Sequence, residues 1–121
     1  MNRIREIKFY RTANGRCPVE EFLDSLSGNA AKRVTWMLEL IREVERIPEC
    51  YFKKLRGTDD IWECRVQFGS NTFRLLGFWP GHSTLVLTHG FIKKSQKTPR
   101  REIKRAERFK DEFLRRSVEN G

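Results

Sequence analysis

The chain has 121 residues, of which 38% are hydrophobic and 12% aromatic, so its length and composition predict one globular domain over residues 1–121. This apolar content excludes a disordered chain, even though 34% of the residues are charged. The formal net charge of +9 favours a polyanionic partner, which would be nucleic acid or an acidic protein.

The positive charge is concentrated near the C-terminus. Residues 93–121 carry 11 basic and 5 acidic side chains, a net +6, whereas residues 1–92 carry 14 basic and 11 acidic ones, a net +3. A basic segment attracts polyanions through counterion release and long-range steering. A solvated C-terminal helix would have the same composition, so the charge alone leaves both interpretations open.

The three cysteines, Cys17, Cys50 and Cys64, are odd in number and follow no zinc-binding spacing. No cluster of His, Cys and carboxylate residues has metal-ligand spacing either, so we expect neither a metal nor another cofactor. The N-terminus lacks the apolar stretch of a signal peptide, and no segment reaches the roughly 18–20 apolar residues of a membrane span. These features predict a cytoplasmic protein without membrane contact.

Turn signals and hydrophobic periodicity predict the elements of the first half. Residues 4–10 form a strand with one break in its alternation. Pro18 opens a short helix, because proline fits a first helical turn. Asn29 is the predicted N-cap of a second helix, which runs to about Ile47 and stops before a proline. The apolar stripe of this second helix consists of Ala30, Val34, Met37, Leu38, Ile41 and Val44.

Three strands and a helix are predicted for the second half. The strands cover residues 61–68, 72–79 and 84–93, and a basic helix begins at Pro99. The narrow apolar stripe of this helix consists of Ile103, Ala106, Phe109 and Phe113. Together the elements predict an α+β fold. A small antiparallel sheet, made of the N-terminal strand and a three-stranded meander, packs against the two N-terminal helices, and the basic helix closes the chain.

The two turns of the meander set the pairing of its strands. A two-residue turn at Gly69-Ser70 places Arg65 opposite Arg74. A four-residue turn at residues 80–83 places Arg74 opposite His89. Paired residues share a face, and cations that face one another repel, so an open row of this kind favours an anion such as a phosphate group above it. A slip of one residue in either turn would move a strand's side chains to the opposite face.

This register gives the sheet two different faces. One face is apolar, and we expect the two N-terminal helices to pack on it. Its residues are Trp62, Cys64, Val66, Phe68, Phe73, Leu75, Trp79, Val86, Thr88 and Ile92. The other face carries the cationic row at one end and apolar side chains at the other: Ile61, Leu76, Phe78, Leu85 and Leu87. We expect the C-terminal helix to cover the apolar end and to leave the polar end open as a shallow basic trough.

Such a trough has the groups that metal-free RNA cleavage needs. Arginine grips phosphate with two hydrogen bonds, and histidine or a lysine of lowered pKa can act as base or acid. The predicted catalytic residues are Arg65, Arg74, His89 and Lys93, and the predicted RNA-binding residues are Lys53, Lys54, Arg56, Lys94 and Lys97. Each has a plainer interpretation: Arg65 could pair with Glu63, His89 could be a hydrogen-bonded, semi-buried histidine, and the lysines could be solvated.

Five segments occur in a characteristic order: PVEEFL from Pro18, KLRG from Lys54, IWECR from Ile61, TFRLL from Thr72 and HGFIKKSQKTP from His89. In this order the chain resembles the RelE/HigB superfamily of bacterial toxins, and more closely its phage-derived HigB-like branch. The resemblance implies a metal-independent endoribonuclease that cuts mRNA, often on the ribosome, and so inhibits translation and growth. It also implies a helix-turn-helix antitoxin, through which alone the toxin would meet operator DNA.

The chain departs from this family at two points. Relatives often carry two lysines on the second strand of the sheet, where this chain has Glu63 at one of the positions. Some relatives also use a C-terminal tyrosine beside the scissile phosphate, whereas the tyrosines here are Tyr10 and Tyr51. His89 or a lysine would then be the base. The alternatives are a non-catalytic basic module that binds RNA or an acidic partner, and a toxin that acts on tRNA.

Overall fold

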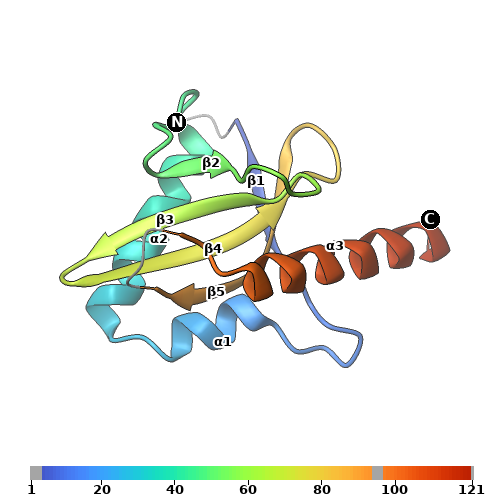
Figure 1. Ribbon diagram of the computed structural model, residues 1–121, viewed down its shortest axis with the longest axis horizontal. Coiled ribbons are helices and arrows are strands. Elements are labelled where there is room, and N and C mark those ends of the chain that lie inside the picture. The colour runs from blue at the N-terminus through green and yellow to red at the C-terminus, as the bar shows by residue number, and fades with distance from the viewer. Residues whose placement is uncertain (1–3, 94–96, 121) are drawn as a thin grey trace.

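A five-stranded sheet with helices on both faces organises the chain, as Figure 1 shows. The computed structural model describes residues 4–93 and 97–120. The elements in chain order are β1 (Glu6–Phe9), α1 (Pro18–Asp24), α2 (Gly28–Glu43), β2 (Phe52–Lys54), β3 (Trp62–Phe68), β4 (Asn71–Phe78), β5 (Thr84–Ile92) and α3 (Arg100–Asn120). Across these described residues, no helix combines the length and apolar character needed to span a bilayer.

The strand order is β1-β5-β4-β3-β2, and this confirms the α+β class. The predicted purely antiparallel sheet is wrong in one respect, because β1 runs parallel to β5 at the edge of the sheet. The short edge strand β2 was also absent from the prediction. It has only three residues, two of them lysines, so it shows no alternation that a sequence pattern could reveal.

Two cores lie on opposite faces of the sheet. The larger one is formed with α1 and α2, and it contains the predicted stripe of α2 except Val44, which is exposed. The smaller one lies under α3, whose predicted stripe of Ile103, Ala106, Phe109 and Phe113 packs on Ile61, Leu76 and Phe78. In Figure 1, α2 lies behind the sheet and α3 in front of it, with its last turns beyond the sheet. The predicted cover by the C-terminal helix is therefore confirmed.

Helix α2 ends at Glu43, four residues before the predicted Ile47. The guanidinium group of Arg5 explains the early end, since it donates to the carbonyl oxygen of Ile41 at 2.8 Å and also to those of Val44 and Glu45. The carbonyl groups at a helix C-terminus need such donors. The donor for these carbonyl groups is therefore a side chain that is distant in the sequence, and no residue near the end of α2 indicates it.

The strand pairing at the first turn of the meander is confirmed, with Arg65 opposite Arg74. At the second turn the prediction is wrong, because a β-bulge interrupts the ladder between Leu76 and Gly77. Leu76 pairs with His89 and Gly77 with Leu87, so that β5 contains one extra residue and Arg74 lies opposite Phe91.

The bulge exchanges the faces of three residues. Leu85 and Leu87 join the core under α1 and α2, and Val86 joins the core under α3, the reverse of the prediction. Gly77 permits the close approach of β5, because a Cβ there would lie 2.6 Å from the carbonyl oxygen of Val86. Counting residues from the turn assumes an unbroken ladder and cannot detect this insertion.

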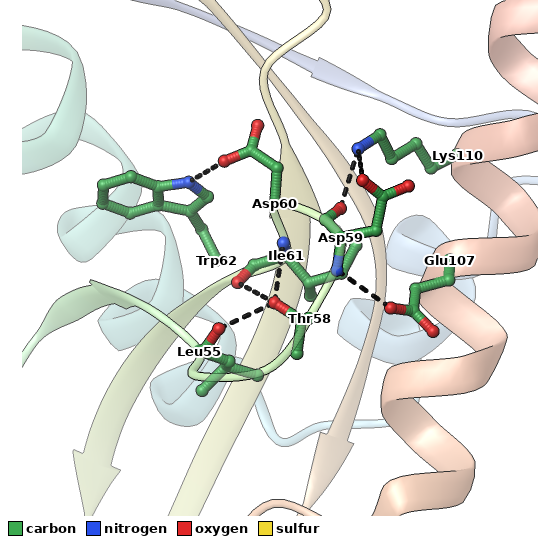
Figure 2. A network of polar contacts seen from close by, with 8 residues as sticks. All are labelled: Leu55, Thr58, Asp59, Asp60, Ile61, Trp62, Glu107 and Lys110. Carbon is green, nitrogen blue, oxygen red and sulfur yellow. Dashed lines mark hydrogen bonds and ion pairs between the residues drawn. The ribbon is translucent and has the colours of Figure 1, made fainter.

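The connection between β2 and β3 is fastened to α3, as Figure 2 shows. The ammonium group of Lys110 donates to the carbonyl oxygen of Asp59 at 2.7 Å and lies 3.4 Å from its carboxylate. The backbone N–H of Asp59 donates to Glu107 at 3.1 Å. Helix α3 therefore holds the loop that connects β2 with β3.

Within the same loop, Thr58 and Asp60 form local bridges that are drawn in Figure 2. The Thr58 hydroxyl donates to the carbonyl oxygen of Leu55 at 2.7 Å and accepts from the N–H of Ile61 at 3.1 Å. Asp60 has a φ of 56°, and its carboxylate accepts from the indole N–H of Trp62 at 3.0 Å. The orientation of Trp62 at the start of β3 is thereby set by the loop.

The N-cap of α2 gives a direct test of the fold. The Ser27 hydroxyl accepts from the N–H of Ala30 at 3.2 Å, so Ser27 is the cap and the predicted Asn29 is not. We expect Ser27→Ala to lower the free energy of unfolding by about 1 kcal/mol, because a helix N–H loses its acceptor. Asn29→Ala is the matched control and should change it by less than about 0.5 kcal/mol. Urea unfolding measures both, and an equal loss in the two variants would contradict the assigned cap.

Candidate functional site

A groove of about 1240 Å³ runs along the edge strand β2. Its charged lining is mainly basic, with six Lys or Arg side chains against two Glu: Arg5, Lys53, Lys54, Arg56, Arg65, Lys97, Glu49 and Glu63. Lys53 pairs with Glu63 and Lys54 pairs with Trp62 across β2 and β3. Because side chains alternate along a strand, the two neighbouring lysines project on opposite faces of the sheet and the groove wraps around its edge.

Glu63 lies at the centre of the charged groups on the α3 face. Its carboxylate is 3.5 Å from Nη1 of Arg74, and both side chains are almost completely buried, with 1% and 2% exposed. The Arg74 guanidinium group donates to the Thr98 hydroxyl at 2.9 Å, and that hydroxyl in turn donates to Glu63. The predicted open trough is therefore wrong at Arg74, because Glu63 and the segment before α3 enclose it.

Arg65 differs from Arg74 in its exposure. Its Nη2 atom lies 3.6 Å from the Glu63 carboxylate, so the alternative pairing considered from the sequence is present. The Arg65 side chain is nevertheless 29% exposed and lines the groove. Glu63 thus lies between the two arginines and relieves their repulsion across the strands, while Arg65 remains accessible to an anion in the groove.

His89 is enclosed beneath α3. Its Nε2 atom is 3.1 Å from the carboxylate of Glu102 and its Nδ1 atom is 3.0 Å from the hydroxyl of Thr88. Burial, reinforced by the nearby charge of Arg105, lowers the pKa of His89 to about 4. The neutral ring at pH 7 donates from Nε2 to the Glu102 carboxylate, which leaves Nδ1 without a proton beside the Thr88 hydroxyl.

The predicted openness of His89 is thus wrong, since only 1% of the residue is exposed. The bulge places it opposite Leu76 rather than Arg74, at the edge of the apolar core. Its ring packs against Phe91 and Phe109, with ring centroids 5.9 and 6.0 Å apart. The alternative considered from the sequence, a hydrogen-bonded histidine, is present, but the residue is fully buried rather than semi-buried.

The remaining predicted residues divide into two groups. Lys53, Lys54, Arg56 and Lys97 line the groove. Lys93 does not line it, although its backbone N–H extends the pairing of β5 by donating to Thr72 at 3.0 Å. Lys94 lies outside the described residues.

Sequence reasoning missed Thr98 and Glu102, and it recognised only part of the role of Glu63. Thr98 and Glu102 meet strand residues across long stretches of chain, and no local pattern signals such contacts. Glu63 was visible as a departure from the family, but its place between two arginines emerges only from the strand pairing. Within residues 4–93 and 97–120, no group of three His, Cys, Asp or Glu side chains could hold a metal ion.

Comparison with known proteins identifies the family. Residues 21–111 match the family described as Phage derived protein Gp49-like (DUF891). A solved structure of the archaeal RelE-RelB complex from Pyrococcus horikoshii OT3 is similar over 78% of this chain and 99% of that chain, with 18% identity and a TM-score of 0.48. No match was found among curated protein sequences.

The family match extends from α1 into α3 and includes β2, β3 and the cations of the groove except Arg5. The Gp49-like family is a family of RelE/HigB-type toxins. The chain belongs to the phage-derived Gp49-like family, and the resemblance inferred from its sequence motifs is confirmed.

The buried pair of Glu63 and Arg74 predicts strong coupling. Removing one partner leaves a charge without its compensation in a buried place, so Glu63→Leu or Arg74→Met should each lower the free energy of unfolding by roughly 3–5 kcal/mol. The double variant should be clearly less destabilised than the sum of the two, because it leaves neither charge behind. Chemical denaturation of the wild type, the two single variants and the double variant measures the coupling energy. Additive losses would show that the ion pair contributes no coupling energy to stability.

His89 predicts a dependence of stability on pH. The unfolded chain takes up the imidazole proton near pH 6.5 and the folded chain only near pH 4, so stability falls as the pH drops through this window. The loss attributable to His89 should approach about 3 kcal/mol at pH 4. We expect His89→Gln to reduce this dependence, whereas His82→Gln, in the exposed 80–83 turn, should retain it. Identical profiles of unfolding free energy in the two variants would refute the assignment.

Proposed function

We propose that this protein is the toxin of a toxin–antitoxin pair and a metal-independent endoribonuclease that cleaves mRNA on the ribosome. Given the family, one observation of the structure supports this proposal most directly. Cations from two strands and the adjoining loops line a single groove, and Arg65 presents a half-buried guanidinium group to it. A groove of this charge favours a ribose–phosphate chain, because phosphate accepts paired hydrogen bonds from arginine.

In this proposal Arg65 stabilises the charge that grows on the phosphate during cleavage. Lys53 and Lys97 line the same groove and are candidates for binding the backbone or transferring protons. Lys93 remains a candidate catalytic residue, but it would contact the substrate only if the RNA extends past the groove. Arg74 becomes a positioning residue, because it holds Glu63, which in turn contacts Arg65. His89 likewise supports the packing of α3.

The proposed partners follow from this role. The substrate is mRNA, the site of action is the ribosome in the cytoplasm, and a helix-turn-helix antitoxin holds the toxin inactive. The toxin would meet operator DNA only through that antitoxin. Inhibition of translation and growth would be the result of its release.

A second function is favoured by the burial of Arg74 and His89. Two of the four predicted catalytic side chains have 2% or less of their surface exposed and are engaged with Glu63 and Glu102. A protein of this kind could bind RNA, or an acidic partner, through the groove without cleaving anything. The two functions share the groove and differ in whether a bond is broken.

Induced expression in a bacterium that lacks the antitoxin separates these functions. We expect growth arrest and cleaved transcripts with the wild-type chain. Arg65→Ala should reduce cleavage by about 10²–10³-fold, because a donor to the developing phosphate charge is lost. Lys32→Ala removes an equal charge from the exposed surface of α2 and should leave cleavage unchanged.

Purified protein completes this test. The Arg65→Ala variant should retain its free energy of unfolding to within about 1 kcal/mol, as expected for a partly exposed ion pair. A chelator should not reduce cleavage of mRNA by the wild-type chain on ribosomes. Intact transcripts and normal growth after induction of the wild-type chain would leave the non-catalytic module as the function.

A further inference from the structure

The groove continues around β2 to the α2 face of the sheet, where its wall is aromatic. Phe52 and Trp62 stack with ring centroids 5.0 Å apart, and Trp79 meets Trp62 edge-on at 6.1 Å. All three residues line the groove, and both indoles are half-buried rather than enclosed. Neither tryptophan has a role in the cleavage chemistry proposed above.

A cation accompanies this aromatic wall. Lys54 is directly paired with Trp62 across β2 and β3, so the two side chains share a face. The lysine is exposed, and it also lines the groove. On the other side of Trp62 the paired residue is Gly77, which has no side chain, and Trp79 lies two residues further along the chain. An exposed lysine is therefore the cross-strand neighbour of an indole.

The combination of aromatic rings and cations along one groove matches single-stranded nucleic acid. Every base can stack on an aromatic side chain, whereas the bases of a duplex are already stacked on one another. An unstacked base has a phosphate on each side of it, and a cation near each phosphate favours binding. Lys54 provides a cation on one face of β2, and Lys53 and Arg65 provide cations on the other face. A single strand that bends around the sheet edge would pass both of these adjacent lysines.

We propose that the Trp62–Trp79 wall binds a nucleobase of single-stranded RNA, with Lys54 at the neighbouring phosphate. This subsite rests on the proposed function, because it lies on the same groove as Arg65 and extends the path of the substrate. It would fix one nucleotide next to the segment held by Arg65. The subsite is indifferent to base identity, since stacking uses the face of the base and not its edge.

Two reporter proteins test the subsite by fluorescence, since the chain has three tryptophans. The first retains only Trp79, through Trp36→Phe and Trp62→Phe. The second retains only Trp36, whose side chain is exposed on α2 and does not line the groove, through Trp62→Phe and Trp79→Phe. Titration with an oligouridine should quench the Trp79 reporter to saturation and leave the Trp36 reporter unchanged. Equal quenching, or none in either reporter, would overturn the proposal.

Affinity measurements add the contribution of each residue. Trp79→Leu keeps an apolar side chain without a stacking face and should weaken binding of the oligouridine about tenfold, whereas Trp36→Leu should not. Lys54→Gln should reduce the slope of log affinity against log salt by about one unit, as for one lost phosphate contact. Circular dichroism and thermal melts of each variant establish that it is folded.

Competition distinguishes a specific subsite from general charge attraction. An oligoglutamate of equal charge and a duplex RNA of equal length should both displace the oligouridine much less effectively than unlabelled single strand. Equal displacement by oligoglutamate would overturn the proposal in favour of an acidic protein partner. If RNA binds with equal affinity to Trp79→Leu and Trp36→Leu, the subsite is wrong while the RNA-cleaving function, measured separately by transcript cleavage, is unaffected.

Discussion

The carboxylate of Glu63 lies between two arginines that the meander places directly opposite one another. Without an anion at this point, Arg65 and Arg74 would repel across the strands, and Arg74 would be a buried charge with less compensation. The Thr98 hydroxyl bonds both Arg74 and Glu63, so the same cluster fixes the segment that leads into α3. The Glu63 carboxylate thus contacts two strands of the sheet, the segment before α3 and Arg65 at the same time.

This arrangement divides the cations of the chain by role. Arg74 and Arg5 are used within the fold, the first by Glu63 and Thr98 and the second by the carbonyl groups at the end of α2. Lys53, Lys54, Arg56 and Arg65 surround the edge strand, where the lining of the groove keeps a surplus of positive charge. An anionic chain that follows this edge would meet Lys53 and Arg65 on one face, and aromatic rings together with Lys54 on the other.

Much of the fold could be predicted because its signals are local. Pro18 marks the start of α1, the Gly69-Ser70 turn sets the pairing of β3 with β4, and the apolar stripe of α3 marks its buried side. The bulge at Gly77 could not be predicted in this way, because it depends on how closely β5 approaches β4. The candidate site was predicted only partly for the same reason. Five of the six Lys and Arg residues that line the groove were among the predicted residues and Arg5 was not, whereas the burial of Arg74 and His89 depends on residues far along the chain.

The sequence by itself determined the α+β class, the family and the identity of the basic residues near the edge of the sheet, because periodicity, turn residues and ordered motifs are properties of neighbouring positions. Only the tertiary structure decided which of those residues meet solvent. Thr98 and Glu102 close over Arg74 and His89, and the alternation of β2 sends Lys53 and Lys54 to opposite faces. The exposure of a charge is set by what packs above it, and that is a property of segments that are distant in the chain.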